Sequence, residues 1–167
     1  WREQPLRESL SLLYRELADY CEAKYSMLTQ HTDPEKALPP LLVRQQKAVD
    51  LITQCYQQMH MLSAQNNTDY KRMLRIFQEA LDLQEHISVS LHQPEEVQKL
   101  VERSHAEEVI RWNAQTVAAR LRVLADDILY HRLPTRFTME KQIGALEKIA
   151  RQHPDNPVGQ FCYWHFS

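Results

Sequence analysis

Only two glycines, Gly144 and Gly159, occur in the 167 residues of this chain. Tight hairpins and phosphate-cradling loops need residues that accept a positive φ, and glycine is the usual one. Leucine, glutamine, glutamate, arginine and alanine instead fill long stretches between prolines, a composition typical of helical bundles. The sequence therefore predicts an all-α fold and argues against most glycine-dependent nucleotide-binding motifs.

The bulk composition limits the classes of protein to which the chain can belong. A length of 167 residues suits one domain, 1–167, with a hydrophobic core of its own. Twenty Lys and Arg against 22 Asp and Glu give a net charge of −2, too balanced to indicate a nucleic-acid partner. No apolar run reaches the ~18 residues that a membrane span needs. Three widely spaced cysteines, with no CxxC pair, predict reduced thiols rather than a disulfide framework.

Apolar residues recur every three or four positions over four long stretches. They predict helices over 5–29, from Pro39-Pro40 to about 65, over 69–91 and up to about 132, with a short turn after Pro94. Residues 32–35 predict a stop and restart after the first helix, with Asp33 as an N-cap before Pro34. The last of these helices begins at a capping box formed by Ser104 and Glu107. A shorter helix is predicted over 138–149. We expect an elongated antiparallel helical bundle of four long helices plus a shorter fifth, which packs on the bundle or extends it.

Each predicted helix has a row of residues expected to face the core. In the first helix the row is Leu6, Leu10, Leu13, Leu17, Tyr20 and Leu28. In the second it is Leu42, Val49, Ile52, Tyr56 and Met59, with Leu62 and Met61 as further candidates. In the fourth it is Val109, Trp112, Thr116, Ala119, Val123 and Ile128, with Trp112 as a core anchor. In the fifth it is Met139, Ile143, Leu146 and Ile149.

The sequence contains no residue that we assign as catalytic, cofactor-binding or metal-ligating. Di-iron bundles need two Glu-x-x-His motifs, and only one such spacing, from Glu102 to His105, occurs here. Cys162 and His165 form a C-x-x-H spacing without a second pair. Cys21 and Cys55 lie within helical rows, which predicts buried thiols rather than nucleophiles. We therefore expect no enzyme activity, no cofactor and no metal.

Charged residues on the fourth predicted helix have a plain structural interpretation. The neighbouring carboxylates Asp126 and Asp127 point apart on a helix, so they are not an acid–base pair. We expect them to face solvent or to pair with Arg120, Arg122 or Arg132. The arginine-rich stretch 111–136 reads as a solvated helix face.

The two ends of the sequence carry a different signal. Trp1-Arg2 opens the chain without a methionine, and an aromatic cluster over 161–166 closes it. Tryptophan and tyrosine gather where membrane meets water, with Arg or Lys on the cytoplasmic side. Core packing of these aromatics is the alternative explanation. The pattern favours a segment of a longer protein, with both ends at the same, membrane-facing end of the bundle.

Three stretches resemble one family: WREQPLRESL at 1–10, QIGALEKI at 142–149 and NPVGQ at 156–160. They are similar to bacterial inner-membrane proteins of the FUSC class, which are fusaric-acid-resistance or aromatic-acid-exporter-like proteins, and within it to the YccS/YhfK group. The resemblance covers the whole chain. It implies a soluble segment on the cytoplasmic side, excised from between two transmembrane bundles of a transporter. The family has no short catalytic motif in this segment, so no residue role is carried over.

Two functions stay open on this basis. The favoured one is an assembly and coupling module, whose partners are the transmembrane domains of its own full-length chain, with a homo-oligomer as a further expectation. The other is a regulatory domain that senses a small organic or aromatic anion. A broad exposed apolar face would favour assembly, and inward Arg or His residues around an apolar pocket would favour sensing.

Overall fold

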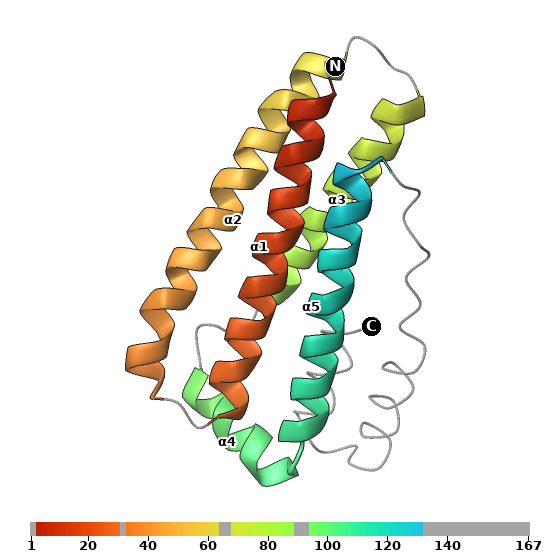
Figure 1. Cartoon of the computed structure of the whole chain (residues 1–167). Coiled ribbons are helices and arrows are strands. Elements are labelled where there is room, and N and C mark those ends of the chain that lie inside the picture. The colour runs from red at the N-terminus through yellow and green to blue at the C-terminus, as the bar shows by residue number, and fades with distance from the viewer. Residues whose placement is uncertain (1–2, 31–32, 64–67, 89–93, 132–167) are drawn as a thin grey trace.

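The computed structural model describes residues 3–30, 33–63, 68–88 and 94–131 (Figure 1). These residues form five helices: α1 (Gln4–Thr29), α2 (Pro34–Leu62), α3 (Thr68–Ser88), α4 (Pro94–Ser104) and α5 (Glu107–Leu129). No strand occurs among them, which confirms the all-α prediction. The short turn expected after Pro94 is the helix α4. The predicted helix over 138–149 lies outside the described residues, so the four-plus-one arrangement stays a prediction.

Helix α1 is the centre of the described fold. It packs against all four other helices, and it lies between α2 and α5 in Figure 1, with α4 across one end. Its predicted core row is confirmed, because all six of its members are buried. The Tyr14 hydroxyl donates to the carbonyl of Ile76 on α3 at 2.7 Å. This bond joins α1 to α3 and satisfies a phenol that is otherwise surrounded by apolar side chains.

The start of α2 confirms one prediction and corrects another. Helix α2 begins at Pro34, and the predicted cap Asp33 accepts the Glu35 N–H at 3.1 Å. Pro39 and Pro40, expected to open the helix, lie inside it. Both prolines are exposed, so the backbone carbonyls that lose an N–H partner lie on a hydrated part of the helix.

The row of α2 that faces the core is partly confirmed and partly one residue away from the prediction. Met59 and Leu62 are buried, as predicted. The other buried residues are Leu41, Ala48 and Cys55. The predicted positions Leu42, Val49, Tyr56 and Met61 are exposed, and Ile52 is half-buried. One residue turns a helix face by about 100°. The smaller side chains at positions 48 and 55 allow α2 to approach α1 closely, which leaves the bulkier row outside.

Helix α5 shows the same shift, and the prediction that Trp112 anchors the core is wrong. Trp112 is 50% exposed and Val123 is 46% exposed. Of the predicted row only Ile128 is buried. The buried face of α5 consists of Ile110, Asn113, Ala114, Val117, Ala118, Leu121, Ala125, Asp127 and Ile128. Three of these are alanines, and an indole would not fit in so close a contact with α1.

The predicted capping box at the start of α5 does not form. Ser104 ends α4, and its hydroxyl donates to the carbonyls of Leu100 and Val101 at 2.9 and 3.0 Å. His105 follows with a φ of 52°. The N–H groups of His105 and Ala106 then bond back to α4, which is a Schellman ending. Helix α5 starts at Glu107 without a side-chain cap.

Candidate functional site

The most organised polar cluster lies where α5 meets the outer side of α1. The Arg122 guanidinium donates to Glu22 through Nη1 at 2.8 Å and through Nη2 at 3.0 Å. Its Nη2 also donates to Asp19 at 2.8 Å. These hydrogen bonds raise the pKa of Arg122 above its ordinary value, Glu22 contributing most. The arginine is therefore a fixed positive charge that joins the two helices.

Asp19 extends this cluster to α2. Arg44 of α2 lies 3.7 Å from Asp19 and 3.3 Å from Glu16, both on α1. The arginines of α2 and α5 thus share one carboxylate on the helix between them. These side chains are partly exposed, so each pair contributes little to stability and mainly sets the position of the helices.

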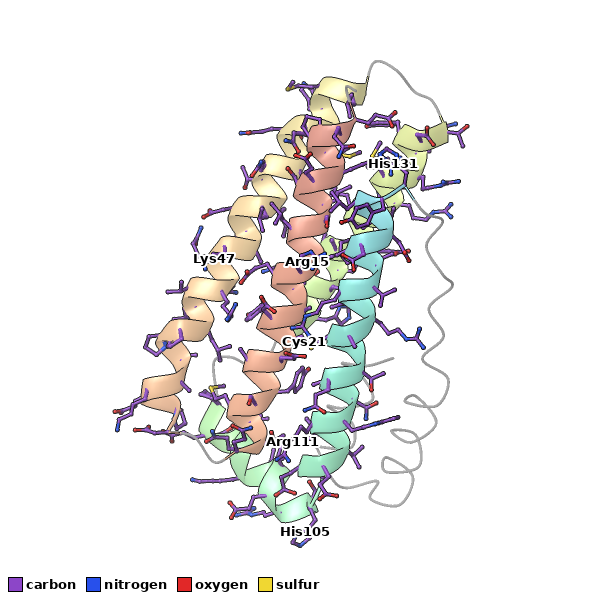
Figure 2. The ribbon with its side chains drawn as sticks, viewed as in Figure 1. Arg15, Cys21, Lys47, His105, Arg111 and His131 are labelled. Atoms are coloured by element: carbon purple, nitrogen blue, oxygen red, sulfur yellow. The ribbon has the colours of Figure 1, made fainter. Side chains whose placement is uncertain are left out.

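The neighbouring aspartates of α5 differ from the expectation. Asp126 pairs with Arg15 of α1, a residue that Figure 2 labels at mid-length of that helix. Asp127 is buried at 6% exposure rather than solvent-facing. Asp126 thus pairs with α1 and not with Arg122, whose own hydrogen bonds go to Glu22 and Asp19. Arg132 lies outside the described residues. Since the two carboxylates have separate surroundings, the structure gives them no shared acid–base role.

The thiols of α1 and α2 are unsuited to nucleophilic chemistry. Cys21 and Cys55 are free and buried, as predicted. Burial raises the pKa of each thiol to about 12, so both are protonated at neutral pH. Two further candidates do not form a site: Glu102 and His105 are exposed at the end of α4 (Figure 2). Cys162 and His165 lie outside the described residues.

No group of three or more His, Cys, Asp or Glu side chains suited to a metal ion occurs in the part of the chain that the structure describes. The sequence interpretation had assigned no ligands. The structure adds no ligand set for which a metal could be proposed.

One titratable side chain escaped the sequence interpretation. Lys24 of α1 is fully buried, and its ammonium lies 5.3 Å from the centroid of the Tyr25 ring. Burial lowers the pKa of Lys24 to about 7. The signal was available in the spacing, because positions 17, 21, 24 and 28 continue one buried row of α1. A lysine in that row is an amine held at a core position.

A shallow cleft of ≈ 170 Å³ lies between the end of α1 and the start of α5. Its lining includes Glu22 and Tyr25 from α1, Gln30 directly after that helix, and Arg111 and Gln115 from α5. Figure 2 places Arg111 at this end of the molecule. Pockets for drug-sized ligands occupy ~300–1,000 Å³ and are mostly apolar. This cleft is smaller, polar and holds charges of both signs, so it is no selective anion pocket.

The exposed apolar side chains are a more prominent feature than any cleft. On α2, Leu42, Val49 and Tyr56 repeat every seven residues and are 47%, 39% and 64% exposed. We call these three residues the α2 outer row. Positions one heptad apart lie on nearly the same side of a helix, so the row forms a single stripe. Lys47 lies outside the stripe and is labelled on the exposed side of α2 in Figure 2.

None of the helices that the structure describes is both long and apolar enough to cross a membrane. A protein-family model described as "FUSC-like inner membrane protein yccS" matches residues 1–167. The "Uncharacterized protein YhfK" of Escherichia coli (strain K12) is 99% identical over 166 residues. That alignment covers 99% of this chain but 24% of the relative, so the chain spans about a quarter of that protein's length. No solved structure matches the chain.

Proposed function

The chain belongs to the FUSC-like inner membrane protein family, and from that premise we propose that it is a cytoplasmic assembly and coupling module of a membrane transporter. Its partners are the membrane segments of its own full-length protein. The relative is about four times longer than this chain, so most of the protein lies outside it. No catalytic step is assigned to the segment.

The observation that carries the proposal is the α2 outer row. A monomeric helix normally turns its large apolar side chains inward and its polar side chains outward. Leu42, Val49 and Tyr56 break that rule on one stripe, while the buried side of the same helix holds Ala48 and Cys55. Exposed apolar stripes of this kind mark surfaces that another protein segment covers. The polar cleft beside Arg111, in the described part of the chain, gives anion sensing no comparable support, because it is small and contains Glu22.

The ion pairs around α1 fit a coupling role. Arg44 from α2 and Arg122 from α5 both reach Asp19, so the three helices are pinned to one another on the outer side. A displacement applied to α2 would then pass to α1 and α5 through packed side chains and these pairs. Such rigid elements transmit motion between separate membrane segments better than flexible linkers do.

The cytoplasmic placement rests on family membership and on positive charge near the start of the chain. Arg7, however, is occupied within the fold: its Nη1 donates to the carbonyl of Ile128 at 3.4 Å, at the end of α5. Arg2 and the aromatic cluster at 161–166 lie outside the described residues. Labelling an engineered cysteine at Gln30 with an impermeant reagent tests the placement, and labelling from the periplasm would contradict it.

Photo-crosslinking in the full-length membrane protein tests the coupling role. Tyr56 is replaced by a photoreactive phenylalanine analogue, and Lys47 is replaced in the same way as a matched control on α2. We expect position 56 to crosslink to membrane-domain peptides and position 47 to give far less adduct. Crosslinks to a second copy of the protein alone would indicate that the α2 outer row mediates oligomerisation and not coupling. Equal or absent adducts at both positions would reject the proposal.

A further inference from the structure

Helix α5 carries a second apolar stripe beside its buried face. Its members are Val109, Trp112, Thr116, Ala119 and Val123, and we call them the α5 outer row. Val109 and Thr116 are half-buried, and Val109 packs against the core. The steps between them are three, four, three and four residues, the spacing of a helix–helix seam. Trp112 and Val123 are 50% and 46% exposed, and Ala119 is exposed as well. The stripe is therefore shaped to receive another helix.

The row has little need for polar partners. The hydroxyl of Thr116 already donates to the carbonyl of Trp112 at 2.8 Å. Val109, Ala119 and Val123 have no polar side-chain atom, so an apolar helix face can cover them without leaving a hydrogen-bonding group unsatisfied. The indole N–H of Trp112 is a donor, and it stays hydrated only where the covering segment does not reach this half-exposed side chain.

The position of the row leaves one side of α5 for a new neighbour. Helix α1 is the main neighbour of α5 among the described helices, and it contacts the face that holds Ala114, Ala118 and Ala125. The α5 outer row lies on a different side of the helix. A segment that packs there would not compete with α1.

The course of the chain suggests which segment this is. Helix α5 ends at Leu129, and His131 turns the backbone with a φ of 57°. His131 also contacts Gln4, at the end of the bundle where α1 starts (Figure 2). Residues 132–167 continue from that point. Helices joined by a short connection become antiparallel neighbours.

We propose that the end of the α5 outer row that holds Ala119 and Val123 is the docking surface for residues 138–149 of this same chain. The sequence places Met139, Ile143, Leu146 and Ile149 at helical spacing in that segment. A tether of a few residues gives an effective concentration of order millimolar, far above that of a second copy in solution. The proposal is independent of the coupling role, since it concerns another helix and another partner.

Length limits how much of the row the segment covers. A helix over 138–149 would be roughly 18 Å long, at 1.5 Å per residue. Running back from the end of α5, it reaches Val123 and Ala119. Trp112 lies roughly 16 Å beyond Val123 along α5, so it stays outside the contact. Gly144 and Ala145 fall near Val123, where small side chains permit close approach.

Hydrogen exchange on the 167-residue chain tests this inference. We expect amides within 138–149 to exchange at least ~10-fold slower than in an unstructured peptide, independently of protein concentration. Val123→Asp should remove that protection and leave α1 protected. Val43→Asp, at an exposed apolar position on α2, is the matched control and should leave it intact.

A second variant tests whether Val123→Asp removes protection only because it unfolds the chain. Ile143→Asp changes only the docking segment, and it should expose the same amides without altering α1 or α3. Intrinsic exchange rates at 138–149 in the unmodified chain would overturn the inference. Protection that survives both Val123→Asp and Ile143→Asp would overturn it too. Protection that rises with protein concentration would assign the row to a second copy instead.

Discussion

Helices α1 and α5 pack against each other, yet they differ in how many of their apolar faces are covered. In α1 the large side chains, such as Leu13 and Leu17, face inward and are fully buried. In α5 the inward side combines alanines with Leu121 and other buried residues, while Trp112 and Val123 face outward. Helix α1 has neighbours on several sides, so the described helices cover its large apolar side chains. Helix α5 lies at the edge of the bundle and has two apolar faces, of which the described residues cover one.

The first prediction contrasts the two faces directly. Leu17→Ala in α1 should lower the free energy of unfolding by ~2–5 kcal/mol, because it leaves a cavity at a fully buried position. Trp112→Ala should cost under ~1.5 kcal/mol, since half of that side chain is already exposed, against ~3–5 kcal/mol for a buried aromatic. Urea unfolding of the 167-residue chain measures both. Equal costs would remove the distinction between the faces.

The second prediction tests the close contact between α5 and α1. Ala118→Leu adds volume at a fully buried position, and overpacking should destabilise the chain by ~1–3 kcal/mol. Gln115→Leu places the same side chain on an exposed part of α5 and should change stability by less than ~0.5 kcal/mol. Thermal melting of the two variants compares them. An Ala118→Leu variant as stable as Gln115→Leu would show that this contact is loose.

The third prediction concerns Lys24, the one lysine in the core row of α1. Burial lowers its pKa to about 7 in the folded chain from the ordinary lysine value of 10.5, so the unfolded chain binds more protons between these values. Stability should therefore rise with pH in that range, by about 1.5 kcal/mol from pH 7 to pH 8.5. Above about pH 9, ionisation of Cys21 and Cys55 in the unfolded chain opposes the trend.

Lys24→Met supplies the control for that measurement. The variant keeps an unbranched side chain of similar length but cannot titrate. Its stability should change less between pH 7 and pH 8.5 than that of the unmodified chain, because the contribution of the lysine is gone. Parallel pH profiles for the two chains would contradict the assignment of the trend to Lys24.

The smallest predicted effect is that of the ion pairs around Asp19. Arg122→Gln should destabilise the chain by less than ~1 kcal/mol at low salt, because the partners are more than a third exposed. The difference should shrink as the salt concentration rises toward ~0.5 M. Denaturation at two ionic strengths checks this. A salt-independent loss would mean that Arg122 acts through packing of its alkyl chain.

The sequence predicted the helices better than their orientation. Helix α1 was correct to within one residue in its bounds and correct in its buried row, because leucines and one tyrosine mark a single face. In α2 and α5 the predicted rows followed the largest apolar residues, Val49, Tyr56 and Trp112. The buried rows contain Ala48 and Ala118, small residues that let the helix axes approach each other closely but that add little apolar surface. Spacing alone cannot rank two apolar rows on one helix, since both have the same period.

Other errors had local causes. Pro39 and Pro40 look like a helix start because proline fits the first turn, but Asp33 offered an earlier cap. Ser104 and Glu107 have capping-box spacing, yet the serine hydroxyl bonds back into α4 instead. The ion pairs between Arg44, Asp19 and Arg122 join residues far apart in the sequence. No pattern within one helix predicts such pairs before the helices are placed.

Cysteine accessibility on α2 tests most directly whether an outward apolar stripe of this chain is a contact surface. Val49→Cys and Lys47→Cys are compared in a Cys162→Ser background, so that the introduced cysteine is the thiol of this segment that the reagent reaches. Cys21 and Cys55 can stay, because both are buried. In the isolated 167-residue chain both cysteines should react with a maleimide at similar rates. In the full-length membrane protein we expect the cysteine at position 49 to react at least ~10-fold more slowly and the one at 47 to be unchanged. Equal rates at position 49 in the two proteins would contradict the account.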